Sequence, residues 1–160
     1  MELEENKIPE EQGDEAVEIY SKKAIFWFSI FPSSIFGSIL LMLNLKAAGY
    51  KKELFAVLIF TILYYFVASY ALAGFVQLSG IDLLAYQEKF RAYKGGPNPI
   101  DGKIILLLGA FIALNIIGGL ILTQYFFKKY FPEEDYYPKS IVMPLIIFIL
   151  IIGLPIIASM

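Results

Sequence analysis

Residues 24–45, AIFWFSIFPSSIFGSILLMLNL, form an uncharged apolar stretch that is long enough to cross the hydrocarbon core of a bilayer. Lysines flank this stretch on both sides, so both of its ends are expected at polar boundaries. Pro32 stands near the middle and removes one helical hydrogen bond. Two interpretations follow: one helix kinked at Pro32, or a re-entrant hairpin with arms 24–31 and 33–45.

The two interpretations distribute the thirteen lysine and arginine residues differently. Four continuous spans with a cytoplasmic N-terminus place seven of them inside and six outside. With so small a difference, the positive-inside rule hardly favours one orientation over the other. A re-entrant first segment places nine inside and four outside. Against the hairpin, the eight residues before Pro32 make only about 12 Å of helix. The continuous span is therefore the preferred expectation.

Three further apolar segments follow, at residues 54–79, 104–127 and 140–159. The whole chain is 58% hydrophobic with a mean hydropathy of +0.66, whereas soluble domains are about 45–50% apolar. The four segments predict an all-α fold, a polytopic membrane helical bundle. Residues 19–160 are expected to form one membrane-embedded domain.

The connection at residues 81–94 has a helical pattern of its own. Leu83, Tyr86, Phe90 and Tyr93 follow the spacing of one apolar helix face, with charged residues elsewhere around the helix. Two glycines and a proline at 95–97 provide a stop signal. A short interfacial helix is predicted here.

Residues 1–18 carry eight acidic side chains and few large apolar ones. Such a segment cannot bury enough surface to fold alone, and it is predicted to be a flexible cytoplasmic tail. A docking segment for a basic partner is the alternative. The acidic start and the long apolar run after it do not fit a cleavable signal peptide.

Small residues recur at four-residue spacing in the first and third apolar segments, a pattern that lets helix backbones approach closely in lipid. The residues predicted to pack helices in this way are Ser29, Ser33, Gly37, Gly109, Ala113 and Gly119. Pro32 and Pro155 are predicted hinges, because proline interrupts the helical hydrogen bonds.

A second set of residues places polar groups within the apolar segments. Its members are Thr61, Tyr65, Ser69, Gln77 and Asn115. The first four share one ridge of the second segment, and Asn115 stands in the third. In hydrocarbon each such group favours a partner on a neighbouring helix, so polar helix contact is the main interpretation. The lining of a hydrated pore is the alternative.

The residue types exclude much chemistry. The chain has no histidine and no cysteine, and no aspartate or glutamate lies within the four apolar segments. Membrane-embedded metal sites, proton relays and serine hydrolases normally need such groups. No catalytic residue, metal or cofactor is therefore expected, and no nucleic-acid partner.

The run from Phe28 to Gly49 has a Phe-rich, glycine-containing centre and ends in an Asn-x-Lys-x-x-Gly turn at Asn44, Lys46 and Gly49. In these residues the chain resembles a loose group of uncharacterised small multi-pass membrane proteins of bacteria. The resemblance covers less than a fifth of the chain. It implies a location in the bacterial cytoplasmic membrane and no particular activity.

Two functions are carried forward from the sequence. The first is a non-catalytic integral membrane protein that serves as a subunit, assembly factor or anchor in a membrane complex. Its partners would be the lipid bilayer and a protein bound through residues 1–18 or the small-residue helix faces. The alternative is a small oligomeric channel or facilitator whose pore lacks titratable residues.

Overall fold

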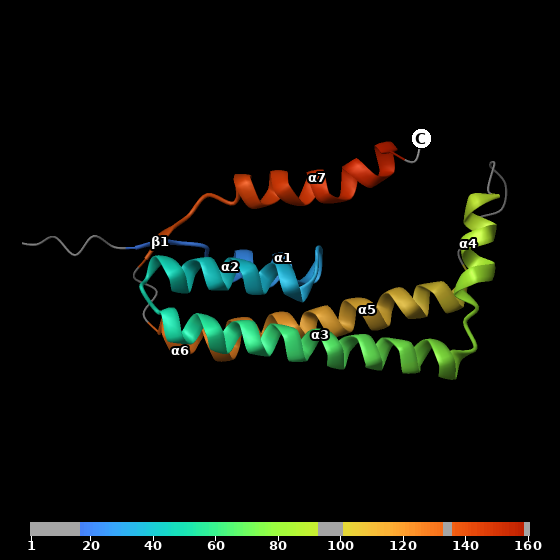
Figure 1. The fold of residues 1–160 in the computed structure, drawn as a ribbon, viewed down its shortest axis with the longest axis horizontal. Helices are drawn as coiled ribbons and strands as arrows, with labels where there is room; N and C mark the ends of the chain where they lie inside the picture. The colour runs from blue at the N-terminus through green and yellow to red at the C-terminus, as the bar shows by residue number, and fades with distance from the viewer. Residues whose placement is uncertain (1–16, 93–100, 133–135, 159–160) are drawn as a thin grey trace, which may run out of the picture.

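The computed structural model describes residues 17–92, 101–132 and 136–158, and this part of the chain is largely helical (Figure 1). The helices are α1 (Lys22–Ile30), α2 (Ser34–Ala47), α3 (Lys51–Ser79), α4 (Leu83–Arg91), α5 (Gly102–Leu120), η1 (Ile121–Phe127), α6 (Lys128–Tyr130) and α7 (Val142–Ala158). Two short strands, β1 (Glu18–Ile19) and β2 (Tyr137–Pro138), pair in parallel. The prediction of an all-α helical bundle is confirmed for these residues, apart from this short ladder.

The first apolar segment folds back on itself. α1 ends at Ile30, residues 31–33 turn the chain, and α2 returns beside α1 (Figure 1). The side chain of Asn44, near the end of α2, hydrogen-bonds the backbone of Tyr20, just before α1, so the two arms are antiparallel. The structure therefore has a hairpin in place of the preferred continuous helix. Pro32, which cannot donate a backbone hydrogen bond, lies in the reversal.

The hairpin packs against two long helices. α3 has 29 residues, and α5, η1 and α6 continue one another from Gly102 to Tyr130, also 29 residues. Both are long and apolar enough to cross a membrane. α3 begins before the segment predicted from hydropathy, and the α5–α6 helix extends beyond its segment at both ends, because lysines lie in these added turns. The seven residues of η1 are π-helical, a form of helix that is often found at functional sites.

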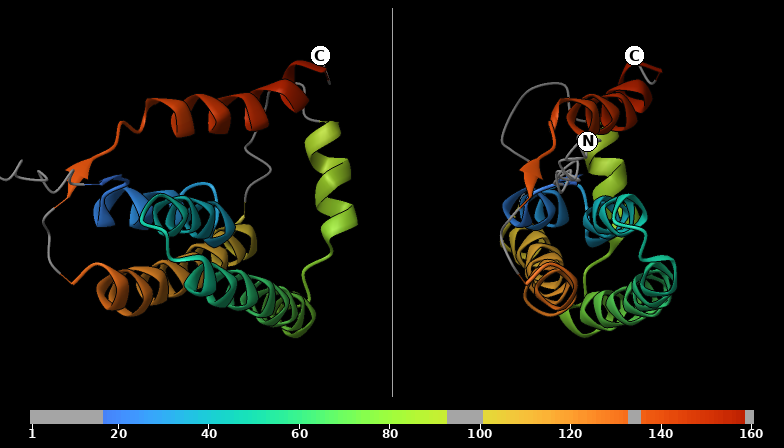
Figure 2. Two further views of the ribbon diagram at one scale, coloured as in Figure 1. Left: turned by 60° about the vertical axis from the view of Figure 1, so that its left-hand side comes forward. Right: turned by 90° about the vertical axis from the view of Figure 1, so that its left-hand side faces the viewer.

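The end-on view shows how these elements are layered (Figure 2). α1 packs against α5 and η1, and α2 packs against α3. The buried apolar core lies among these helices in the half of the bundle that the hairpin covers, and it includes Ile25, Leu41, Leu45, Val57 and Leu122. α7 lies on the other side of the hairpin, where the Phe36 and Phe148 rings approach to 6.3 Å. The outer halves of α3 and α5 are left uncovered by the hairpin (Figure 1).

Glycines supply the left-handed backbone at two of the connections. Gly49, between α2 and α3, has φ +79°, and Gly80, directly after α3, has φ +59°. Both values lie in the region that residues with a Cβ rarely adopt, so glycine ends the preceding helix at low cost. The turn at Gly49 lets α2 and α3 run in opposite directions side by side, and the turn at Gly80 leads from α3 into α4.

The helix predicted at residues 81–94 is present as α4, which stands roughly perpendicular to α3 and α5 at their far end (Figure 1). Asp82 caps it by accepting a hydrogen bond from the Ala85 amide at 3.0 Å. Tyr86 donates its hydroxyl to Asp101, which also caps α5. This hydrogen bond lowers the pKa of the Asp101 carboxyl and raises the pKa of Tyr86. Tyr93 and the stop signal at 95–97 lie outside the described residues, as does most of the acidic tail.

Candidate functional site

The open end of the hairpin is held by one amide. Asn44 accepts a hydrogen bond from the Tyr20 N–H through Oδ1 at 2.8 Å and donates one to the Tyr20 carbonyl through Nδ2 at 2.7 Å. Asn44 is 1% exposed and Tyr20 is 6% exposed. The Asn44 side chain thus satisfies both backbone groups of a buried residue, as a neighbouring strand would. This contact fixes the start of α1 to the end of α2.

Near the tip of the hairpin the two arms and α5 come into close contact around Ser29. Its hydroxyl donates to the Ile25 carbonyl of its own helix at 2.7 Å. A Cβ placed on Gly37 would lie 1.9 Å from Ser29 Oγ, and one placed on Gly119 would lie 2.9 Å from Ser29 Cβ. Three of the residues predicted to pack helices therefore meet at one point, with α1 between α2 and α5.

The tip of the hairpin meets the middle of α5. The first backbone amide of α2, that of Ser34, donates to Asn115 Oδ1 at 3.0 Å. Next to it, a Cβ on Gly118 would lie 2.8 Å from the Ser34 Cβ and 2.8 Å from the Tyr64 ring. Tyr64 itself donates its hydroxyl to the Leu114 carbonyl at 2.5 Å. These contacts join α2, α3 and α5 at one level.

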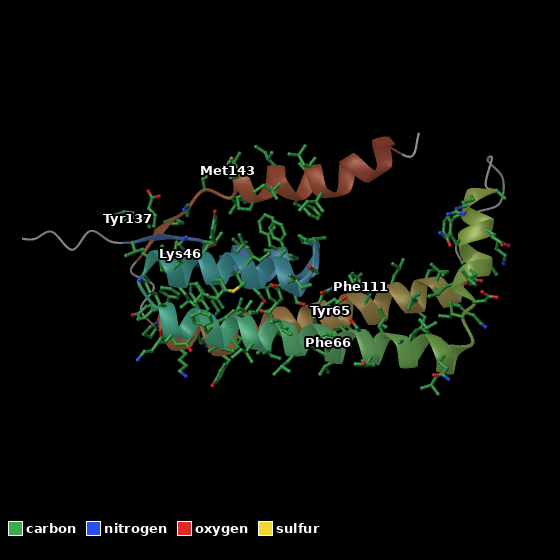
Figure 3. The ribbon with its side chains drawn as sticks, viewed as in Figure 1. Lys46, Tyr65, Phe66, Phe111, Tyr137 and Met143 are labelled. Atoms are coloured by element: carbon green, nitrogen blue, oxygen red, sulfur yellow. The ribbon has the colours of Figure 1, made fainter. Side chains whose placement is uncertain are left out.

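A cavity of about 130 Å³ opens at this junction. Its polar lining residues are Ser33, Ser34, Tyr65, Ser69 and Asn115. Figure 3 shows Tyr65 of α3 and Phe111 of α5, which also lines the cavity, beside the end of the hairpin. Asn115 is 5% exposed, and its Nδ2 is a buried donor without a hydrogen-bond partner among the described residues. An unpaired buried donor costs free energy, so a polar ligand or water at this site would be stabilised.

The lining of the cavity limits its chemistry. The cavity contains hydroxyl and amide groups and the positive end of the α2 helix dipole, but no side chain that titrates near neutral pH. In the part of the chain that the structure describes, no group of three or more histidine, cysteine, aspartate or glutamate residues could hold a metal ion. The hydroxyl and amide groups suit the cavity to binding a polar group.

The remaining predicted residues lie elsewhere. Thr61 donates its hydroxyl to the Val57 carbonyl of its own helix at 2.7 Å, and Gln77 lies exposed near the far end of α3. Gly109 and Ala113 lie exposed on α5, and a Cβ on Gly109 would meet nothing within 4 Å. Pro155 lies within α7, which is helical through that position. None of these residues lines the cavity at the hairpin tip.

Three contributors were not singled out as site residues from the sequence: Asn44, Tyr64 and Gly118. Asn44 stands near the end of its apolar segment, where an amide usually faces water, and its partner is a backbone 24 residues away. Tyr64 and Gly118 adjoin the predicted residues Tyr65 and Gly119, but they occupy the neighbouring helix face. The adjacent pair Gly118-Gly119 could have indicated this site from the sequence, because two adjacent glycines let a helix approach neighbours on two sides.

Three features of the described structure bear on function. They are the cavity at the hairpin tip, the side of α3 that the hairpin leaves uncovered, and the cluster of lysines at the open end of the hairpin. No family model, curated protein or solved structure matches the chain.

Proposed function

We propose that this protein is a multi-pass protein of the bacterial cytoplasmic membrane in which α3 and the α5–α6 helix cross the bilayer and the α1–α2 hairpin is re-entrant. α1 has nine residues and is about 13.5 Å long, close to half of a hydrocarbon core of about 30 Å. The hairpin would then enter one leaflet and return to the same surface. The first arm is too short to cross the whole membrane, but its length fits a helix that enters only one leaflet.

The distribution of charge supports a cytoplasmic open end. Lys22 and Lys23 begin α1, Lys46 lies in the last turn of α2, and Lys51 and Lys52 begin α3, all at one end of the bundle. With Lys128, Lys129 and Lys139, this end has eight of the basic residues that the structure describes, and the end at α4 has three. The positive-inside rule assigns the richer end to the cytoplasm. In this topology α7 would cross the membrane as a further span.

Within this topology, the function best supported is that of a non-catalytic subunit, assembly factor or anchor in a membrane complex. The observation that carries this proposal is the uncovered side of α3. Tyr65 is 51% exposed, and Ser69 and Gln77 are exposed on the same ridge. Tyr65 and Ser69, which also line the hairpin-tip cavity, lie near the middle of a 29-residue helix, where their exposed parts would meet hydrocarbon in a lone copy. Polar groups at that depth favour a protein partner, either a second copy or another subunit.

Site-specific photo-crosslinking in native membranes tests this proposal. A photoreactive residue at Ser69 is expected to crosslink to protein and produce one band of defined higher mass. The matched control is Val67, which is 64% exposed and lies on the opposite side of the same helix. Crosslinking of Ser69 to lipid alone, as for Val67, would overturn the proposal.

A second candidate, a channel or facilitator for a small polar solute, is favoured by the unpaired Asn115 Nδ2 at the hairpin tip. A helix N-terminus at mid-membrane depth, together with hydroxyls and an amide, provides hydrogen-bond donors for a solute that sheds its water. We expect solute flux in reconstituted liposomes to be abolished by Asn115→Leu and Ser69→Leu. Ser79→Leu is the control, because the Ser79 hydroxyl donates to the Phe75 carbonyl of its own helix at 2.5 Å. Absence of flux from the unaltered protein would remove this candidate.

A further inference from the structure

A second, larger cavity lies at the open end of the hairpin, between α1 and the start of η1. Its volume is about 410 Å³, and nine residues line it. Its polar lining residues include Lys22, Lys23, Gln124 and Tyr136. Neither this cavity nor its lysines take part in the hairpin-tip site, which lies at the other end of α1.

Two lysines give this cavity a positive charge. Among the residues that the structure describes, none of the nine that line it carries a carboxylate. Lys22 donates from Nζ to Gln124 Oε1 at 3.3 Å, which orients the ammonium without neutralising it. Lys23 is exposed beside it. Two ammonium groups with an amide and a phenol form a set of donors that fits a phosphate oxygen cluster.

An apolar groove lies between the hairpin and α7 and shares Trp27 with the basic cavity. It has a volume of about 320 Å³, and its walls are Phe28, Phe31 and Pro32 of the hairpin and Ile141, Leu145 and Phe148 on and before α7. Trp27 lines both the basic cavity and the groove, and its ring stacks on Phe31 at 5.7 Å. No polar surface lines the groove.

The distance covered by α1 matches the acyl-chain depth of one phospholipid leaflet. From Lys22 to the hairpin tip, α1 covers about 13.5 Å, the depth of one leaflet of hydrocarbon. Tyr136 and Trp27 lie near the basic end, where aromatic rings favour the headgroup level. A soluble phosphate compound would use the basic cavity alone and leave the groove unfilled.

We propose that these two neighbouring spaces, which share Trp27, bind one anionic phospholipid, with its phosphate at Lys22 and Lys23 and one acyl chain between α1 and α7. The lipid would fill the space between α7 and the hairpin, where few side chains of the two elements meet. The proposal rests on the membrane location proposed above, but it requires neither the protein partner nor solute flux.

Native mass spectrometry of the full-length protein in mild detergent tests this site. We expect one phosphatidylglycerol to be retained per chain and phosphatidylcholine to be retained weakly. The double variant Lys22→Gln/Lys23→Gln should weaken phosphatidylglycerol binding about thirtyfold, since each interfacial lysine contributes about 1 kcal/mol. The matched control is Lys51→Gln/Lys52→Gln, which removes two lysines at the same end of the bundle, away from the cavity.

A second variant tests the groove independently of the charge. Leu145→Trp adds bulk to the groove wall and is expected to weaken phosphatidylglycerol binding while all lysines remain. Glycerol phosphate, which lacks acyl chains, serves as the soluble probe. Equal loss in the two lysine pairs, equal retention of both lipids, or glycerol phosphate binding as tightly as phosphatidylglycerol would each overturn the proposal.

Discussion

Gly37→Ala is expected to lower the free energy of unfolding by about 1–3 kcal/mol, the usual cost of overpacking a well-filled contact. A Cβ at this position would lie 1.9 Å from Ser29 Oγ and 2.9 Å from the Ile25 carbonyl oxygen. The hydroxyl can rotate away only by giving up its 2.7 Å hydrogen bond to Ile25, and the carbonyl belongs to the α1 backbone. The two arms of the hairpin would have to separate.

SDS titration in mixed micelles, followed by circular dichroism, measures this change. Gly109→Ala is the matched control, because a Cβ there would meet nothing within 4 Å. In a helix interior alanine is about 0.5–1 kcal/mol more favourable than glycine, so the control should be neutral or slightly stabilising. Equal effects of the two substitutions would contradict the close contact between the arms.

Asn44→Leu is expected to destabilise the protein by about 2–4 kcal/mol, because it leaves two buried backbone groups without partners. The leucine side chain has a similar size but can neither accept from the Tyr20 N–H nor donate to the Tyr20 carbonyl. Both groups would remain desolvated, since Tyr20 is nearly fully buried. The start of α1 should then detach from the end of α2.

The same SDS titration measures the Asn44→Leu effect, and hydrogen exchange at the Tyr20 amide locates it. Gln124→Leu provides the control, because it removes an amide whose only hydrogen bond in the described residues is the exposed one to Lys22. We expect that control to change stability by less than about 0.5 kcal/mol. If Asn44→Leu is as mild as the control, the two arms are not joined through this amide.

The helical segments could be predicted from the sequence because hydropathy is a local property. The two long helices and α4 lie where their apolar patterns placed them. The reversal at Pro32 could not be decided locally, since a kinked helix and a hairpin have the same hydropathy. Counting the lysines favoured the hairpin, whereas the length of the first arm favoured the span. The length argument failed because it assumed that each arm must cross the whole membrane.

The small-residue pattern located part of the packing but not its geometry. Ser29, Gly37 and Gly119 meet because the hairpin places α1 between α2 and α5, which spacing along one helix cannot reveal. Asn115 was identified because an amide within an apolar segment is rare. Asn44 was not, because its partner is a backbone amide and carbonyl, which every residue carries. Contacts of this kind leave no pattern in the sequence.

Cysteine accessibility tests the re-entrant hairpin most directly, and the absence of native cysteines makes single labels specific. Cysteines at Glu18 and Tyr50 flank the hairpin, and Gln87→Cys on α4 reports the opposite end. With a membrane-impermeant maleimide, the first two positions should react only in inverted vesicles and Gln87→Cys only in intact cells. Reaction of Tyr50→Cys and Glu18→Cys from opposite sides would show that residues 24–45 cross the membrane and would contradict the hairpin.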